Sequence, residues 1–179
     1  MSDTWKKLLK SARRRPLFVP GTGTTDLNLG RAEIELMIPH RPPFLLVDAI
    51  TAVDVEQTAV SGRRFIDPED PVFAGHFPGD PVYPGVLQVE AMCQLSLCLH
   101  HLISHGGKLN REAGPPALRL LRIGHALFMG EVRPGDEVTL IGKMIEDTGY
   151  TQTCAAQLLK GDTICAITIA EVIGVDAPQ

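Results

Sequence analysis

The sequence lacks the marks of several common protein classes. Its four cysteines form no Cys-x-x-Cys pair and have no ligand-like spacing to histidines, which argues against a metal site. No Gly-Lys-Ser/Thr completes a phosphate loop in the glycine-containing segment 20–26. A net charge of −4 gives no basic footprint for nucleic acid. No apolar segment follows the basic start, as a signal peptide requires, and the longest uncharged run, 91–107, falls short of a membrane span.

What is present suits one globular domain with a peripheral extension. Of the 179 residues, 44% are hydrophobic and 21% charged. Residues 1–16 carry six Lys or Arg and one Asp, so the remainder has a net charge of −9. We therefore expect a basic extension over 1–29, flexible or peripheral and mostly solvated, and a folded domain over 30–175. The alternative for the extension is a basic amphipathic helix over 5–15 that docks on an acidic partner or an anionic membrane surface.

The periodicity predicts one long helix and a set of strands. Residues 84–104 are apolar on nearly all sides, which is typical of a buried helix. Turn signals separate strand-like segments in the order of an antiparallel meander, and a short helix is expected over 31–38. A buried helix and about six antiparallel strands predict an α+β hotdog fold, in which the sheet wraps around the helix. The expected strands are 44–50, 55–66, 117–128, 137–145, 150–159 and 163–173. Cys93, Cys98, Cys154 and Cys165 lie in these elements and are expected as reduced core residues of a cytoplasmic protein.

Two residues of the chain combine the chemistry of a base and an acid. His76 lies on a Gly/Pro-rich loop, 14 residues ahead of Glu90, which lies in the apolar run. A carboxylate buried among apolar residues needs a partner or a chemical task. An acid that works near neutral pH needs its pKa raised from about 4.3 towards about 6–7, and burial is a sufficient cause. A histidine near a helix N-terminus stays neutral, which suits a base. The free N–H of Gly85, at the first turn, could bind a developing oxyanion.

Each of these residues also has a purely structural interpretation. His76 alone could be an ordinary turn residue, and Glu90 could be the buried partner of Arg119 or Arg122. We interpret His40, which precedes the first strand, as structural, and no histidine cluster suggests a metal or cofactor. Taken together, a histidine and a glutamate beside a free helix N-terminus favour catalysis.

The loop and the helix that follows resemble a known active site. Residues 73–94, with Gly-His-Phe-Pro-Gly at their start, resemble the active-site block of bacterial 3-hydroxyacyl-[acyl-carrier-protein] dehydratases, the FabZ/FabA family. Residues 38–48 are similar to that family's first-strand block, and 133–136 to its Pro-Gly-Asp turn. The similarity spans about 29–174 in the family's order. Glu90 resembles the FabZ branch, whereas the Gly-Asp-Pro-Val at 79–82 is closer to the dehydratase–isomerase branch.

The resemblance implies a cofactor-free hydro-lyase of fatty acid or related polyketide and lipid synthesis. It would convert (3R)-3-hydroxyacyl thioesters on an acyl carrier protein into trans-2-enoyl thioesters. On this reading His76 removes the proton α to the thioester and Glu90 protonates the departing hydroxyl. The Gly85 N–H binds the thioester oxygen, and Gln94 orients Glu90. The family further implies a homodimer or a trimer of dimers, with His76 of one chain facing Glu90 of its partner.

One departure from the family concerns the carrier protein. The family's strand before Pro-Gly-Asp carries basic residues that dock the carrier, but 126–132 has none. Arg119, Arg122 and Arg133 are the expected substitutes. The alternative function is a hotdog thioesterase with Glu90 as base, which leaves the Gly-His-Phe-Pro-Gly loop without a task. A non-catalytic acyl-binding hotdog would have no need of the His76–Glu90 pair.

Overall fold

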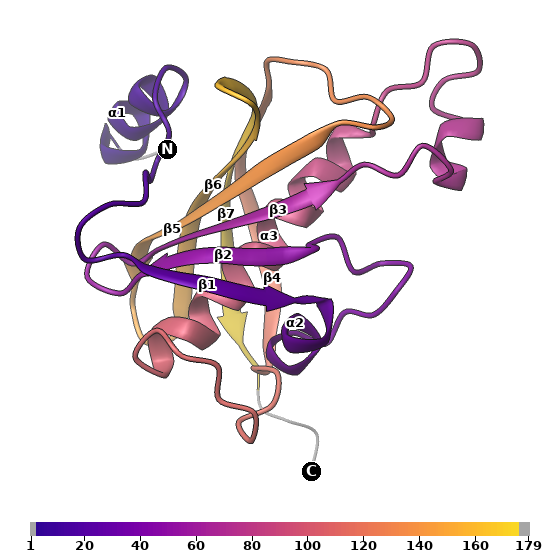
Figure 1. The fold of residues 1–179 in the computed structure, drawn as a ribbon. Coiled ribbons are helices and arrows are strands. Elements are labelled where there is room, and N and C mark those ends of the chain that lie inside the picture. Colours follow the sequence, from indigo (N-terminus) through magenta and orange to yellow (C-terminus); the bar gives the residue numbers. More distant parts are fainter. Residues whose placement is uncertain (1–2, 176–179) are drawn as a thin grey trace.

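The computed structural model describes residues 3–175, which form one antiparallel sheet and three α-helices (Figure 1). The seven strands lie in the order β1-β2-β3-β5-β6-β7-β4. Their bounds are β1 Thr25–Gly30, β2 Ala49–Asp54, β3 Ala59–Phe65, β4 Leu118–Phe128, β5 Glu137–Asp147, β6 Thr151–Lys160 and β7 Thr163–Gly174. The helices are α1 Asp3–Ala12, α2 Arg31–Met37 and α3 Gly85–Ser104, and a short 3-10 helix, η1, spans Pro71–Ala74.

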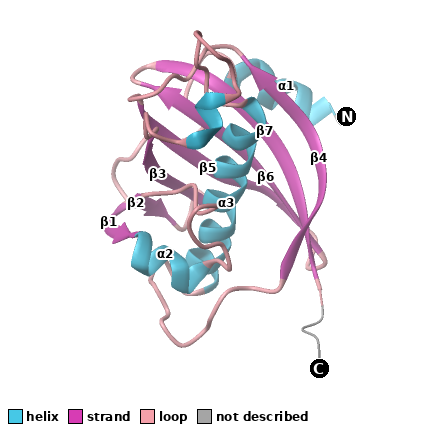
Figure 2. Ribbon diagram, turned by 90° about the vertical axis from the view of Figure 1, so that its right-hand side faces the viewer, coloured by secondary structure: helices cyan, strands magenta, loops and turns pink. Residues whose placement is uncertain are grey.

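The sheet curves around α3, which confirms the predicted hotdog architecture (Figure 2). Leu95, Leu99 and Leu102 on α3 are fully buried against the concave face. Gly62 on β3 allows this approach, because a Cβ there would lie 2.8 Å from the Leu95 side chain. By length and composition α3 could cross a membrane, but 56% of its apolar window is buried inside the fold. The apolar character of α3 is therefore that of a core helix.

Two strand predictions were wrong in their bounds. In place of 44–50 and 55–66, the strands are β2, which begins at Ala49, and β3, which begins at Ala59. Leu45, Leu46 and Val47, before β2, are all buried instead of alternating between two faces. The sheet also gains β1 from a segment that the sequence assigned to the extension. β1 pairs with β2, and its Leu27 and Leu29 pack against the core. The rest of β1 is polar and its burial is only partial, so its strand pattern in the sequence is weak.

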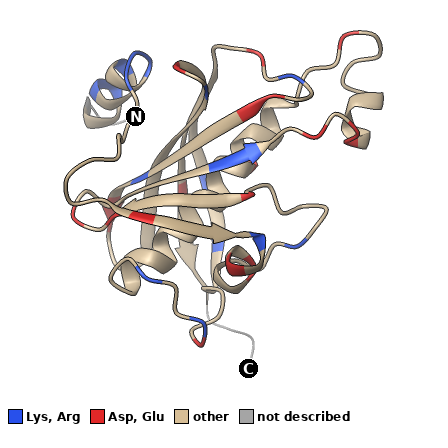
Figure 3. Ribbon diagram, viewed as in Figure 1, with Lys and Arg blue, Asp and Glu red and all other residues tan. Residues whose placement is uncertain are grey.

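The N-terminal extension covers the outer face of the sheet. Leu9, Ala12 and Phe18 are at most 4% exposed and pack with outward-facing apolar residues of the sheet, among them Ile141 and Ile167. These three residues are buried within an extension whose other residues are mostly exposed, and the assignment of 1–29 as a flexible or peripheral extension stays a prediction. The lysines of α1, Lys6, Lys7 and Lys10, are exposed, and Figure 3 shows this helix with blue segments.

Candidate active site

The loop between η1 and α3 holds His76 in a defined tautomer. The His76 Nδ1 atom lies 2.7 Å from the carbonyl oxygen of Val82. A carbonyl only accepts hydrogen bonds, so Nδ1 must carry the ring proton of the neutral imidazole. The backbone adds a second link, from the Val82 N–H to the His76 carbonyl at 3.0 Å. Nε2 is thus left with a lone pair, which is the form that a general base requires.

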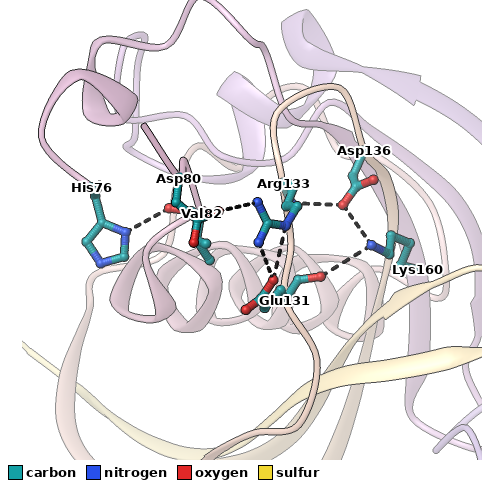
Figure 4. A network of polar contacts seen from close by, with 7 residues as sticks. All are labelled: His76, Asp80, Val82, Glu131, Arg133, Asp136 and Lys160. Carbon is teal, nitrogen blue, oxygen red and sulfur yellow. Dashed lines mark hydrogen bonds and ion pairs between the residues drawn. The ribbon is translucent and has the colours of Figure 1, made fainter. Parts of the chain in front are cut away.

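An ion-pair network fastens the same loop to the turn before β5 (Figure 4). Arg133 binds Asp80 of the loop at 2.7 Å and Glu131 at 2.6 Å. The hydrogen bonds that Arg133 donates to these two carboxylates raise the pKa of its guanidinium. The Arg133 N–H also bonds Asp136, which pairs with Lys160 at 3.2 Å. The charge of Arg133 is therefore already engaged within the chain.

His76 lines a cleft of about 590 Å³ that the first turn of α3 also faces. The N–H groups of Gly85 and Val86 bond no acceptor within residues 3–175, as the geometry of a helix start dictates. The Phe128 ring lies against Gly85, where an added Cβ would be 2.8 Å from the ring. The cleft therefore combines an imidazole base with free backbone donors at the positive end of a helix.

Glu90 lies in a different cavity, of about 200 Å³, between α3 and β4. Its side chain is 26% exposed, so the deep burial expected from the sequence is wrong. The cause is that the apolar run faces two environments. Residues such as Leu95 point into the sheet, whereas Glu90 and Leu97 line the cavity. Most of the other cavity-lining residues are apolar, including Leu118, Leu120 and Val172.

Gln94 holds the Glu90 carboxylate from one turn away. Its side-chain amide is fully buried, and its oxygen accepts a 2.7 Å hydrogen bond from the Leu46 N–H. The amide nitrogen donates to the Phe44 carbonyl and to Glu90 Oε1, each at 2.9 Å. Since the Leu46 N–H requires an acceptor, the amide cannot be flipped, and its N–H must face Glu90.

The remaining contact of Glu90 is with His40, which was interpreted from the sequence as a structural residue. His40 Nε2 lies 3.4 Å from Glu90 Oε1, and His40 lines the same cavity. Neither Arg119 nor Arg122 is the partner of Glu90. Arg122 pairs with Glu171, and Arg119 donates to its own neighbour, the Leu118 carbonyl. The family-like block 38–48 contains His40 and could have drawn attention to it, but nothing in that block predicts its contact with Glu90.

One chain therefore keeps His76 and Glu90 in separate cavities. The cleft of His76 contains Phe128, the last residue of β4, and the cavity of Glu90 contains Leu118, the first.

Among residues 3–175, no group of three or more His, Cys, Asp and Glu side chains could hold a metal. The four cysteines are free, and burial raises the pKa of the Cys93 and Cys154 thiols to about 12. These thiols stay protonated. Cys154 is a core residue, as predicted, whereas Cys93 is only partly buried and lines the cavity that contains Glu90.

Comparison with known proteins supplies the family. A family model described as FabA-like domain matches residues 38–169. The 3-hydroxyacyl-[acyl-carrier-protein] dehydratase FabZ of Protochlamydia amoebophila is 34% identical over 143 residues, which are 80% of this chain and 88% of that protein. The protein of the same name from Clostridioides difficile is 43% identical over 109 residues, 60% of this chain and 70% of its own. The dehydratase heterocomplex ApeI:P from Xenorhabdus doucetiae has a TM-score of 0.59 at 13% identity, with 80% of this chain and 91% of that chain covered, and it shows the fold alone.

Proposed function

The chain belongs to the FabA-like family, and from this membership and the site we propose that it is a 3-hydroxyacyl-[acyl-carrier-protein] dehydratase. It removes water from (3R)-3-hydroxyacyl thioesters and releases trans-2-enoyl thioesters in fatty acid synthesis. His76 Nε2 takes the proton from the carbon next to the thioester. Glu90 gives its proton to the departing 3-hydroxyl, which leaves as water. The Gly85 N–H stabilises the negative charge that develops on the thioester oxygen.

The observation that carries this proposal is the fixed state of the two reacting groups. His76 has its proton on Nδ1, so its free lone pair is on Nε2 in the cleft. Glu90 is held by Gln94 beside an apolar cavity of the kind that accepts an acyl chain. A thioesterase that uses Glu90 as a base would leave the ordered His76 loop without a task. With one hydroxyacyl substrate, the enoyl absorbance band without release of free thiol supports the dehydratase; thiol release supports hydrolysis.

A dimer that unites the two cavities is part of the proposal. Within the described residues β4 has hydrogen-bonded strand pairing only with β7, so its other edge is open. Leu120, Leu121 and Ile123 of this edge strand are each about half exposed (51%, 53% and 48%). Antiparallel pairing of β4 with its copy about the middle residue, Ile123, would place Leu118 opposite Phe128 of the partner subunit. The Glu90 cavity of one protomer would then meet the His76 cleft of the other.

Mixed dimers test the shared site. His76→Ala and Glu90→Gln should each fold as dimers and lose about 10²–10⁴-fold in turnover. When the two variants are refolded together, about half the dimers are mixed, and each has one site with both groups intact. Activity should return to about a quarter of the wild-type value. The matched control refolds His76→Ala with the double variant, which supplies no intact site. Proven mixed dimers without recovery would place both groups in one chain's site.

We further propose that the protein works in the cytoplasm and that the carrier protein docks beside β4. Of the three expected docking cations, Arg122 and Arg133 already pair with carboxylates of the chain. Arg119 is exposed beside the Glu90 cavity and pairs with no carboxylate in residues 3–175, which makes it the strongest of the three. Arg119→Glu should raise KM for the carrier-bound substrate and leave KM for a small thioester unchanged, because charge steers the larger partner. Equal effects on both substrates would place Arg119 in the site itself.

A further inference from the structure

His40 reaches Glu90 from a segment outside both α3 and the His76 loop. It follows α2 and Pro39, and its ring lines the cavity that contains Glu90 and Gln94. The ring is mostly buried, with 23% of the side chain exposed. Its Nε2 lies 3.4 Å from Glu90 Oε1, at ion-pair distance and slightly long for a hydrogen bond.

The oxygen that His40 approaches is the one that Gln94 already binds. The Gln94 amide nitrogen lies 2.9 Å from Glu90 Oε1, so both nitrogen atoms lie near the same carboxyl oxygen. In a protonated carboxyl group one oxygen only accepts hydrogen bonds, and the other carries the proton. The Gln94 N–H already makes Oε1 the accepting oxygen, and a proton on His40 Nε2, 3.4 Å away, would reinforce this. The proton of the acid must then be on Oε2.

The ring of His40 can supply this N–H only in one neutral tautomer, with the proton on Nε2. The other ring nitrogen, Nδ1, is buried and has no hydrogen-bond partner among the described residues. A proton there would be a buried donor without an acceptor, which is costly. Burial, aided by the charge of Arg41, lowers the pKa of His40 against the opposing effect of Glu90. A neutral ring with its proton on Nε2 fits the contact with Glu90, the partnerless Nδ1 and the lowered pKa.

We propose that His40 is a positioning residue: with Gln94, it holds Oε1 of Glu90, so that Oε2 carries and delivers the proton. This proposal rests on the proposed function, in which Glu90 is the acid. His40 acts through Glu90 and does not touch the reacting atoms.

The test compares His40→Leu, His40→Gln and the control His105→Gln in the full-length protein. His105 is a half-buried histidine just beyond α3 that bonds the His101 carbonyl. With a small (3R)-3-hydroxyacyl thioester at pH 7.5, His40→Leu should lower kcat by about 10- to 100-fold with little change in KM. His40→Gln keeps an N–H donor and should stay within about threefold of wild type. The control should match wild type.

Rescue by glutamine separates positioning from simple packing, because leucine and glutamine fill similar volumes and only glutamine offers an N–H to Oε1 of Glu90. The proposal is overturned if His40→Gln is as inactive as His40→Leu. It is also overturned if folded His40→Leu keeps full turnover while Glu90→Gln is inactive. A wild type that forms no enoyl product would instead refute the proposed function.

Discussion

Gln157 on β6 should decide whether the N-terminal extension stays on the sheet. Its side chain is fully buried and makes three hydrogen bonds with the extension. It accepts from the Leu17 N–H at 2.6 Å and donates to the Ala12 and Arg15 carbonyls at 2.6 Å and 3.1 Å. Gln157→Leu keeps the size of the side chain but removes all three bonds at once.

The expected loss of stability follows from the backbone groups that lose their hydrogen-bond partner in Gln157→Leu. A buried backbone group that loses its partner costs about 1–3 kcal/mol. Arg15 is exposed and its carbonyl can bind water, whereas Ala12 is 2% exposed and its carbonyl cannot. We therefore expect Gln157→Leu to destabilise the docked extension by about 2–4 kcal/mol. For a chain of this size, this loss lowers Tm by about 4–16 °C if the extension unfolds together with the domain.

Two measurements check this prediction: thermal unfolding by circular dichroism and the rate of tryptic cleavage in the basic segment 13–15. Gln157→Leu should lower Tm and speed cleavage there, because the released extension becomes accessible to the protease. Gln152→Leu is the matched control on the same strand. It bonds His100 and Asp147, away from the extension, and should leave the cleavage rate unchanged. Wild-type Tm together with a wild-type cleavage rate in Gln157→Leu would refute the reasoning.

Three further predictions follow from the site and the core. Gly85→Ala places a Cβ 2.8 Å from the Phe128 ring, and the ring must then swing into the cleft. We therefore expect kcat/KM to fall while Tm changes little, and restored kcat/KM in Gly85→Ala/Phe128→Leu would confirm the steric cause. Gln94→Leu removes the N–H at Glu90, and both kcat and Tm should fall; wild-type kcat would show that Gln94 does not orient the acid. Burial lowers the pKa of His101, so this histidine binds a proton more readily in the unfolded chain than in the folded one. The free energy of unfolding should therefore fall as the pH drops through about 6.5. Denaturant titrations should show a smaller fall in His101→Gln.

The sequence by itself determined the central helix and the fold class, and it contains in one segment the two groups that are proposed to react. The run that forms α3 is long and apolar enough to predict a buried helix, and the turn signals predicted the antiparallel meander of β5, β6 and β7. His76, Gly85, Glu90 and Gln94 lie within 19 consecutive residues. Local geometry therefore sets their spacing, and a contiguous motif can be recognised without knowledge of the rest of the chain.

Only the tertiary structure decided what surrounds those groups. His40 is 50 residues before Glu90, and the backbone at Phe44 and Leu46 that orients Gln94 is about as far away in sequence. The exposure of Glu90 likewise depends on the cavity beside β4, and no composition predicts a cavity. The extension shows the same limit. Its sequence predicts a solvated basic segment, whereas in the fold Gln157, 145 positions after Ala12, donates a hydrogen bond to the Ala12 carbonyl at the end of α1. The physical reason is that periodicity reports which face of an element is apolar, whereas packing decides which distant side chains meet it.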